Sequence, residues 1–98
     1  MDRPPKKIDE ATVIEWVVLD ETVVKTGKIT MYHNYIEIDN PAAFAMCRYE
    51  DDPDDILVFY CDKHWRVLAA AGYSTIETAK AKIERGYSGT LAKWCRNA

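Results

Sequence analysis

Residues 56–61 of this chain are Ile-Leu-Val-Phe-Tyr-Cys, and this run sets the fold class. It is apolar at every position, so a strand formed by it needs cover on both faces and belongs at the centre of a sheet. Six residues is a typical strand length and is short for a helix. Residues 65–70 follow after a short polar connection, so we expect the two runs to pair as antiparallel strands.

Two earlier runs are also rich in β-branched and aromatic side chains. In residues 12–19, a period of two places Ile14, Trp16 and Val18 on one face of a predicted strand. Residues 29–38 form the second run, which begins after a glycine-containing turn and ends before the stop signal Asp-Asn-Pro at residues 39–41. The sequence therefore predicts one strand from each run.

The segment at residues 41–49 fits two structures. Asn40 could cap a helix that has Pro41 at its first position, or residues 43–49 could form a strand. We predict the strand, because the acidic residues 50–55 look like a loop that joins this segment to the apolar run after it.

The clearest local signal is Ser-Thr-Ile-Glu at residues 74–77, which fits a capping box with Ser74 as the N-cap and Glu77 as its partner. This pattern predicts a helix from residue 75 to about residue 87. Its apolar positions recur at helical spacing: Ile76, Ala79, Ile83 and Tyr87. We expect this stripe to pack on the sheet, and a final helical turn after it to lay Trp94 over the core.

These elements predict an α+β fold, an antiparallel β-sheet of four or five strands with a C-terminal helix packed on one face. Residues 1–10 combine two prolines with charged side chains and are expected to be a mobile leader. Residues 11–98 are then a single domain, because a chain of 98 residues has no room for a second one.

Composition excludes several classes of function. No apolar run reaches the ~18 residues of a membrane helix, and the N-terminus lacks the apolar stretch of a secretory signal, so we expect a cytoplasmic protein that does not bind membranes. The net charge of −3 provides no strongly basic face for nucleic acid. The three cysteines are an odd number without disulfide or zinc spacing, so we predict free thiols, no metal and no cofactor.

One set of residues carries a resemblance: Phe-Tyr-Cys-Asp at residues 59–62, Trp65, Ser-Thr-Ile-Glu at residues 74–77, Ala79, Lys80, Glu84, Tyr87, Gly89 and Trp94. Together they resemble a pattern of small, free-standing bacterial proteins of unknown function, some of them integron cassette proteins. The likeness covers roughly the C-terminal forty residues and consists of positions that form the fold. It therefore implies a fold and no particular chemistry.

Candidate catalytic residues are few. His33 and His64 are the only imidazoles, and Asp62 is the carboxylate nearest to His64 in the sequence. Cys61 and His64 stand three residues apart, which is too small a set for a structural metal site. The acidic run at residues 50–55 lacks the glycine and the ligand order of a calcium loop. We therefore interpret Cys61 as a buried thiol, His64 as a surface residue of a turn and the acidic run as a solvated loop.

The candidate binding surface is the sheet face that a single helix leaves open. A helix of about thirteen residues covers ~20 Å, whereas four or five strands at ~4.8 Å spacing form a face of similar or greater width. The residues expected on that surface are Met31, Tyr35, Phe44, Met46 and Arg48. Loops and the C-terminal tail could cover it instead, and the sequence does not choose between the two.

The sequence thus favours a small binding or interaction protein that self-associates into a homo-oligomer, with a small-ligand groove at the subunit interface. One alternative is a small enzyme that uses a histidine as a general base, although no common catalytic motif is present. The other is an inhibitor or immunity-type protein whose acidic loop faces a basic partner protein.

Overall fold

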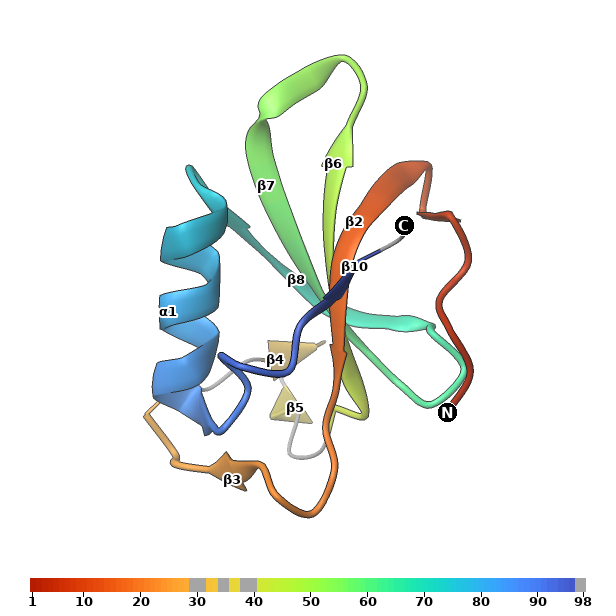
Figure 1. Ribbon diagram of the computed structural model, residues 1–98. Coiled ribbons are helices and arrows are strands. Elements are labelled where there is room, and N and C mark those ends of the chain that lie inside the picture. Colours follow the sequence, from red (N-terminus) through yellow and green to blue (C-terminus); the bar gives the residue numbers. More distant parts are fainter. Residues whose placement is uncertain (29–31, 34–35, 38–40, 97–98) are drawn as a thin grey trace.

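The computed structural model describes residues 1–28, 32–33, 36–37 and 41–96 (Figure 1). The elements in chain order are β1 (Lys7–Ile8), β2 (Ala11–Val18), β3 (Val24–Lys25), β4 (Tyr32–His33), β5 (Ile36–Glu37), β6 (Ala43–Tyr49), β7 (Asp52–Cys61), β8 (Val67–Tyr73), α1 (Ile76–Gly86), β9 (Tyr87–Ser88) and β10 (Cys95–Arg96). The main sheet is antiparallel with the order β1-β2-β6-β7-β8, and β10 also pairs with β2. It curls into a half-barrel with α1 on one side, so the predicted α+β class is confirmed (Figure 1).

Two strand predictions are confirmed in the centre of the sheet. β6 covers residues 43–49, which settles the choice between strand and helix for that segment. The apolar run at residues 56–61 forms the inner half of β7, which pairs with β6 on one side and with β8 on the other. Its side chains pack into buried clusters on both faces of the sheet, as its uniform apolar character requires.

The acidic segment differs from the predicted loop. β7 begins at Asp52, which pairs with Tyr49, so only Glu50 and Asp51 connect the two strands. Residues 52–55 are all exposed, so charged side chains are accommodated on this outer part of the strand. A two-residue connection is enough to join antiparallel strands, which is why a longer loop is not needed.

The described part of residues 29–38 does not form one long strand. β4 pairs with β5, with Tyr32 opposite Glu37 and His33 opposite Ile36, as a small antiparallel hairpin of its own. The prediction of a single strand was therefore wrong for these residues, because β4 and β5 run in opposite directions and pair with each other.

A β-bulge changes the faces of β2. The register with β6 shifts between Val13 and Glu15, so Ile14 is the extra residue. Ile14 packs with the cluster of side chains beneath α1, whereas Trp16 and Val18 pack on the opposite face. The prediction that Ile14, Trp16 and Val18 share a face was wrong, because strict alternation ends at the bulge.

The core has one cluster on each face of the sheet. The helix-side cluster consists of Val17, Phe44, Met46, Ile56, Val58, Tyr60, Ala79, Ile83 and Tyr87. The opposite cluster consists of Ile8, Ala11, Val13, Trp16, Ala43, Ala45, Cys47, Phe59, Cys61 and Trp65. Both sheet faces therefore bury apolar side chains within a single chain.

Helix α1 provides the predicted stripe but begins with a different cap. Thr75 is the N-cap, and its hydroxyl oxygen accepts a hydrogen bond from the Thr78 amide at 3.0 Å. The prediction of Ser74 in this role was off by one residue. Ala79 and Ile83 are fully buried against the sheet, so the predicted apolar face is confirmed.

The first residues of the chain, for which composition predicted a mobile leader, lie against the opposite cluster in the structure. Pro4 and Ile8 are buried, and the Arg3 guanidinium lies 5.4 Å from the centre of the Trp16 ring. The indole Nε1 of Trp65 donates a hydrogen bond to the Asp2 carbonyl at 3.0 Å. This segment therefore covers part of the face that α1 leaves open.

Candidate interaction site at a sheet edge

The two ends of the main sheet differ. β2 is an end strand whose outer edge receives β1, with Lys7 opposite Thr12, and β10, with Cys95 opposite Trp16. β8 forms the other end and pairs with β7, and no described strand forms a ladder on its outer side. β4 lies near β8 without pairing to it. The β8 edge is thus the end of the sheet that stays open among the described residues.

The composition of β8 makes this edge unusual. Its seven residues, Val-Leu-Ala-Ala-Ala-Gly-Tyr, contain no charge and no proline. Natural proteins usually protect edge strands with lysine, proline or very short strands, because the open amide and carbonyl groups can pair with another chain. Ala70 and Gly72 are exposed, so no large side chain shields the middle of the strand. The edge is therefore suited to accept another strand.

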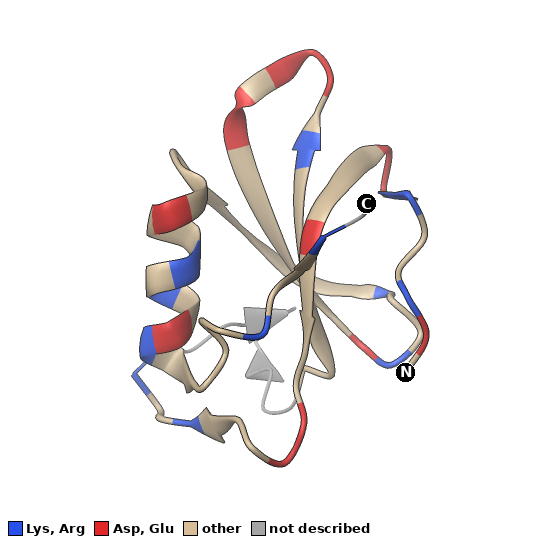
Figure 2. Ribbon diagram, in the orientation of Figure 1, with Lys and Arg blue, Asp and Glu red and all other residues tan. Residues whose placement is uncertain are grey.

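The two ends of β8 carry opposite charges (Figure 2). The turn before the strand exposes Lys63 and Arg66. Beyond its other end lie Glu77, exposed in the first turn of α1, and Asp55, whose Oδ1 is 3.5 Å from the position of a Cβ on Gly72. The edge is therefore neutral along its length and has a basic and an acidic end.

Asp62, a predicted catalytic candidate, shapes the turn before β8. Its Oδ1 accepts hydrogen bonds from the amides of His64 at 2.8 Å and Arg66 at 2.9 Å. These bonds, that from Arg66 above all, hold the pKa of the Asp62 carboxyl below its usual range. The carboxylate thus binds backbone amides, and the exposed His64 belongs to the turn, which fits our interpretation of His64 as a surface residue. The side chain of His33 lies outside the described residues.

The thiols follow the interpretation made from the sequence. Cys47, Cys61 and Cys95 are free, and the first two are buried. Burial raises the pKa of the Cys61 thiol to about 12, so it stays protonated near neutral pH and is a poor nucleophile. Among the described residues no group of three or more His, Cys, Asp and Glu side chains is placed to hold a metal ion.

Two of the predicted surface residues are inside the protein. Phe44 and Met46 are fully buried in the helix-side cluster, where the Phe44 ring lies 4.7 Å from Tyr60 and 4.9 Å from Tyr87 between centroids. The prediction that they form an open surface was wrong for the single chain, because β6 is an interior strand and α1 covers that face. Met31 and Tyr35 lie outside the described residues.

Arg48 is half-buried on β6 and lines a small cavity. The cavity has a volume of about 250 Å³ and is bounded also by Asp54, Ser74, Thr75 and Glu77, together with Pro53, Ile56 and Ile76. The Nε of Arg48 is buried and has no hydrogen-bond partner among the described residues. The cavity adjoins the end of β8, since Ser74 follows that strand directly.

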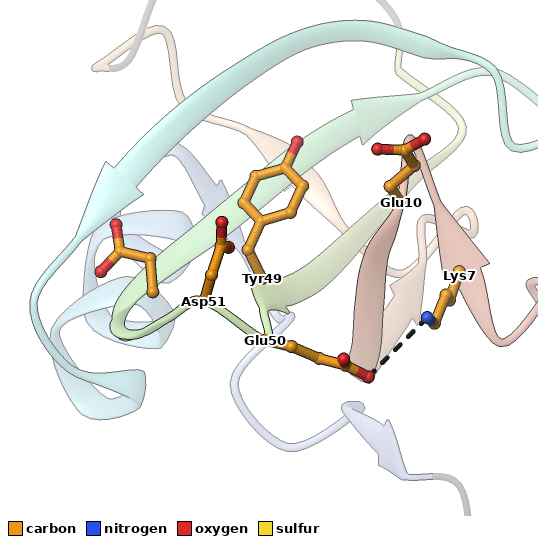
Figure 3. Close-up of a pocket in the computed structure, with 6 residues that line it drawn as sticks. Lys7, Glu10, Tyr49, Glu50 and Asp51 are labelled. Atoms are coloured by element: carbon orange, nitrogen blue, oxygen red, sulfur yellow. Dashed lines mark ion pairs between the residues drawn. The ribbon is translucent and has the colours of Figure 1, made fainter.

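The acidic hairpin between β6 and β7 borders a larger, open hollow of about 590 Å³ (Figure 3). Its lining consists of Lys7, Glu10, Tyr49, Glu50, Asp51 and Asp52. One ion pair crosses it, between Lys7 Nζ and Glu50 Oε1 at 3.8 Å. Both partners of this pair are largely exposed, so it contributes little to stability.

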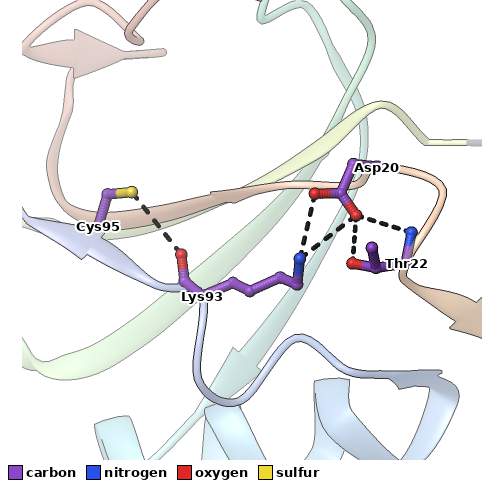
Figure 4. Close-up of polar contacts among 4 residues, drawn as sticks. All are labelled: Asp20, Thr22, Lys93 and Cys95. Atoms are coloured by element: carbon purple, nitrogen blue, oxygen red, sulfur yellow. Dashed lines mark hydrogen bonds and ion pairs between the residues drawn. The ribbon is translucent and has the colours of Figure 1, made fainter.

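The sequence analysis placed Trp94 over the core, where it packs on the helix-side cluster, but it missed the polar anchors of the C-terminal strap, which we define as residues 90–96. Lys93 Nζ pairs with Asp20 Oδ2 at 3.1 Å (Figure 4). Arg96 Nε lies 3.4 Å from Oε1 of Glu15, a buried carboxylate that also accepts from Lys80 at 2.8 Å. A lone carboxylate in the apolar run at residues 12–19 signals a buried partner, but nothing in the sequence places that partner on the helix and the strap.

Comparison of the chain with protein-family models, curated protein sequences and solved structures gave no match. Within the described part of the chain, no helix has the length and apolar character needed to cross a membrane.

Proposed function

We propose that this protein is a binding protein that self-associates, and that the β8 edges of two copies pair as antiparallel strands. The observation that carries the proposal is the uncharged β8 edge, on which no strand of the described residues forms a ladder. Pairing centred on Val67–Tyr73 would place a two-fold axis at Ala70, its central residue, with the irregularity of β8 at Leu68 near each end of the pairing. It would join the two sheets along ~23 Å of strand and pair backbone groups that form no ladder among the described residues.

The charges at the ends of β8 favour a second copy as the occupant. Antiparallel pairing about a two-fold axis brings the basic end of one strand to the acidic end of the other. With Ala70 at the centre, Arg66 of one copy lies opposite Ser74 of the other, beside the region of Asp55 and Glu77. Such complementarity speeds association and fixes register more than it adds affinity.

The burial of both sheet faces also favours the β8 edge, rather than a sheet face, as the surface through which two copies associate. The described residues expose only three large apolar side chains, Met1, Val24 and Leu91. The sequence argument placed self-association on an open sheet face, but both faces bury their clusters within the chain. Backbone pairing at β8 therefore replaces face packing as the basis of the proposal.

The cavity beside Arg48 is where a small-ligand groove would lie in such a pair. Its walls include Ser74 and Thr75, and the proposed register sets Arg66 of the second copy opposite Ser74. The groove would then combine from each chain a guanidinium whose Nε has no hydrogen-bond partner among the described residues with the carboxylates of Asp54 and Glu77. We regard this groove as part of the proposed binding function.

The free, partly buried thiols and the absence of a membrane-spanning helix among the described residues support a cytoplasmic location as a further part of the proposal. A relation to small bacterial gene-cassette proteins is also part of the proposal. The residues behind that resemblance include Tyr60, Trp65 and Tyr87, which are buried and form the fold.

Ala70→Lys tests the proposal against Ala81→Lys, which makes the same charge change on the exposed surface of α1. At the two-fold axis the introduced lysines would face each other directly, and like charges in that position are destabilising. We expect light scattering at micromolar concentration to give two chains for the natural protein and for Ala81→Lys, but one chain for Ala70→Lys. Equal masses for both variants would contradict the assignment of the interface to β8.

A second candidate function is binding of a basic partner protein by the β6–β7 hairpin, as in an inhibitor or immunity-type protein. The hairpin projects from the sheet, and Glu50, Asp51, Asp52, Asp54 and Asp55 on it are all exposed (Figure 2). Titration with poly-lysine at low and high salt tests it, with Asp51→Asn/Asp52→Asn as the variant and Asp2→Asn/Glu21→Gln as the control of equal charge. Equal weakening by the two variants would show only a general effect of net charge.

A further inference from the structure

The outer edge of β2 is covered by two short segments of the same chain. β1 pairs with Ala11 and Thr12, and β10 pairs with Glu15 and Trp16. β2 continues beyond the bulge at Ile14 to Val18, so removal of β10 would open the part of its edge from Glu15 to Val18 while β1 stays on the first part. Very short strands that cover an edge are a known means of preventing further strand addition.

The contacts that hold the strap are mostly outside its ladder with β2. β10 has two residues, both exposed, which is a short pairing by itself. Lys93 pairs with Asp20 at one end of β2, and Trp94 packs on the helix-side cluster. At the start of the strap, the Glu84 carboxylate accepts hydrogen bonds from the amides of Gly89 at 2.7 Å and Leu91 at 3.1 Å. Removing β10 alone would therefore leave these anchors in place.

We infer that the C-terminal strap masks a second strand-binding edge on β2, whose occupant when uncovered is another copy of this chain. This inference rests on the proposed function, because a second open edge leads to polymers only if the β8 edge also binds another copy. A chain with one open edge accepts one neighbour, so association stops at a closed pair. A chain with two open edges accepts two neighbours, so association continues into open polymers. The strap thus determines where assembly ends.

A second copy is the occupant because this edge already accepts strands of the same sequence. Both segments on β2 run antiparallel to it, and Arg96 of β10 adds an ion pair with Glu15 there. The uncovered β2 edge of a second copy presents the same strand, so two such edges can pair about a two-fold axis as proposed for β8. Continuity with the interface proposed at β8 thus favours another copy over an unrelated partner.

The test combines two changes, each of which alters one edge. A chain ending at Trp94 lacks β10 but keeps Lys93 and Trp94, and Ala70→Lys blocks β8. Light scattering over micromolar concentrations should give a pair for the full chain and one chain for Ala70→Lys. The shortened chain should grow to ~45 kDa and beyond. The shortened chain with Ala70→Lys should form a pair. Cys95→Ala, which keeps the backbone ladder of β10 with β2, serves as the control and should stay a pair.

The outcomes separate this inference from the proposed function. If the full chain is a single chain but the shortened one forms pairs, β8 is not an interface and the masked β2 edge still holds. If shortening changes the mass in neither background, the inference is overturned. Should the shortened chain fail to fold by circular dichroism, full-length Cys95→Pro replaces it, because proline removes the amide of β10 that a ladder needs. An unchanged mass for that folded variant would overturn the inference equally.

Discussion

At the scale of single residues, Ile83 tests how the helix stripe contributes to stability. Its side chain is fully buried in the helix-side cluster, whereas the preceding residue, Lys82, is exposed. Ile83→Ala should lower the free energy of unfolding by about 2–5 kcal/mol through lost burial and the cavity left behind. Lys82→Ala should change it by less than about 0.5 kcal/mol. Urea melts of both variants measure the difference, and equal losses would show that the assigned faces of α1 are wrong.

Asp20 gives a prediction about pH. Hydrogen bonds from the side chain and amide of Thr22, with a smaller contribution from Lys93, lower its pKa from 3.8 to about 2. Because the folded pKa lies below the unfolded value, this stabilisation is present above about pH 4 and is lost as the pH falls towards 2. Thr22→Val removes the hydroxyl donor, so NMR titration should find the Asp20 pKa closer to 3.8 in that variant. An unchanged pKa would contradict the assigned cause.

At the scale of secondary-structure elements, the start of α1 can be tested by two neighbouring substitutions. Thr75→Ala removes the hydroxyl that accepts from the Thr78 amide and should destabilise the protein by about 1 kcal/mol. Ser74→Ala is the matched control, since Ser74 is exposed and is not the N-cap, and it should have little effect. Thermal unfolding of both variants measures this, and a larger loss for Ser74→Ala would restore the cap predicted from the sequence.

The secondary-structure elements also show which parts of the fold sequence patterns could predict and which they could not. The apolar run at residues 56–61 predicted the inner half of β7, and the acidic residues before it predicted that residues 43–49 form a strand, which is β6. Apolar residues at helical spacing predicted the buried face of α1. The patterns failed at β2, where one extra residue at Ile14 moves the next side chains to other faces. They also missed β10, since a two-residue strand has no period and is held in place by Glu15 and Asp20, far away in the sequence.

At the scale of the whole molecule, the sequence could predict the class of the fold but not which sheet edge stays open. The order of strands depends on pairings between distant segments, such as Trp16 with Cys95. The predicted surface at Phe44 and Met46 failed for a related reason, since α1 packs on that face of β6 and buries both side chains. The sequence shows that residues 67–73 carry no charge. Only the structure places them at the end of the sheet, where we propose that they pair with another copy.

A cross-link across the proposed two-fold axis tests the β8 pairing most directly. Residues opposite each other in an antiparallel pair have Cα atoms ~4.5–5.5 Å apart, which lies within the range that a disulfide spans. In a Cys95→Ser background, which removes the exposed native thiol, Ala70→Cys is compared with Ala81→Cys under mild oxidation. We expect non-reducing electrophoresis to show a covalent pair for Ala70→Cys and a single chain for Ala81→Cys at the same concentration. Equal, slow cross-linking of both variants would contradict pairing at β8.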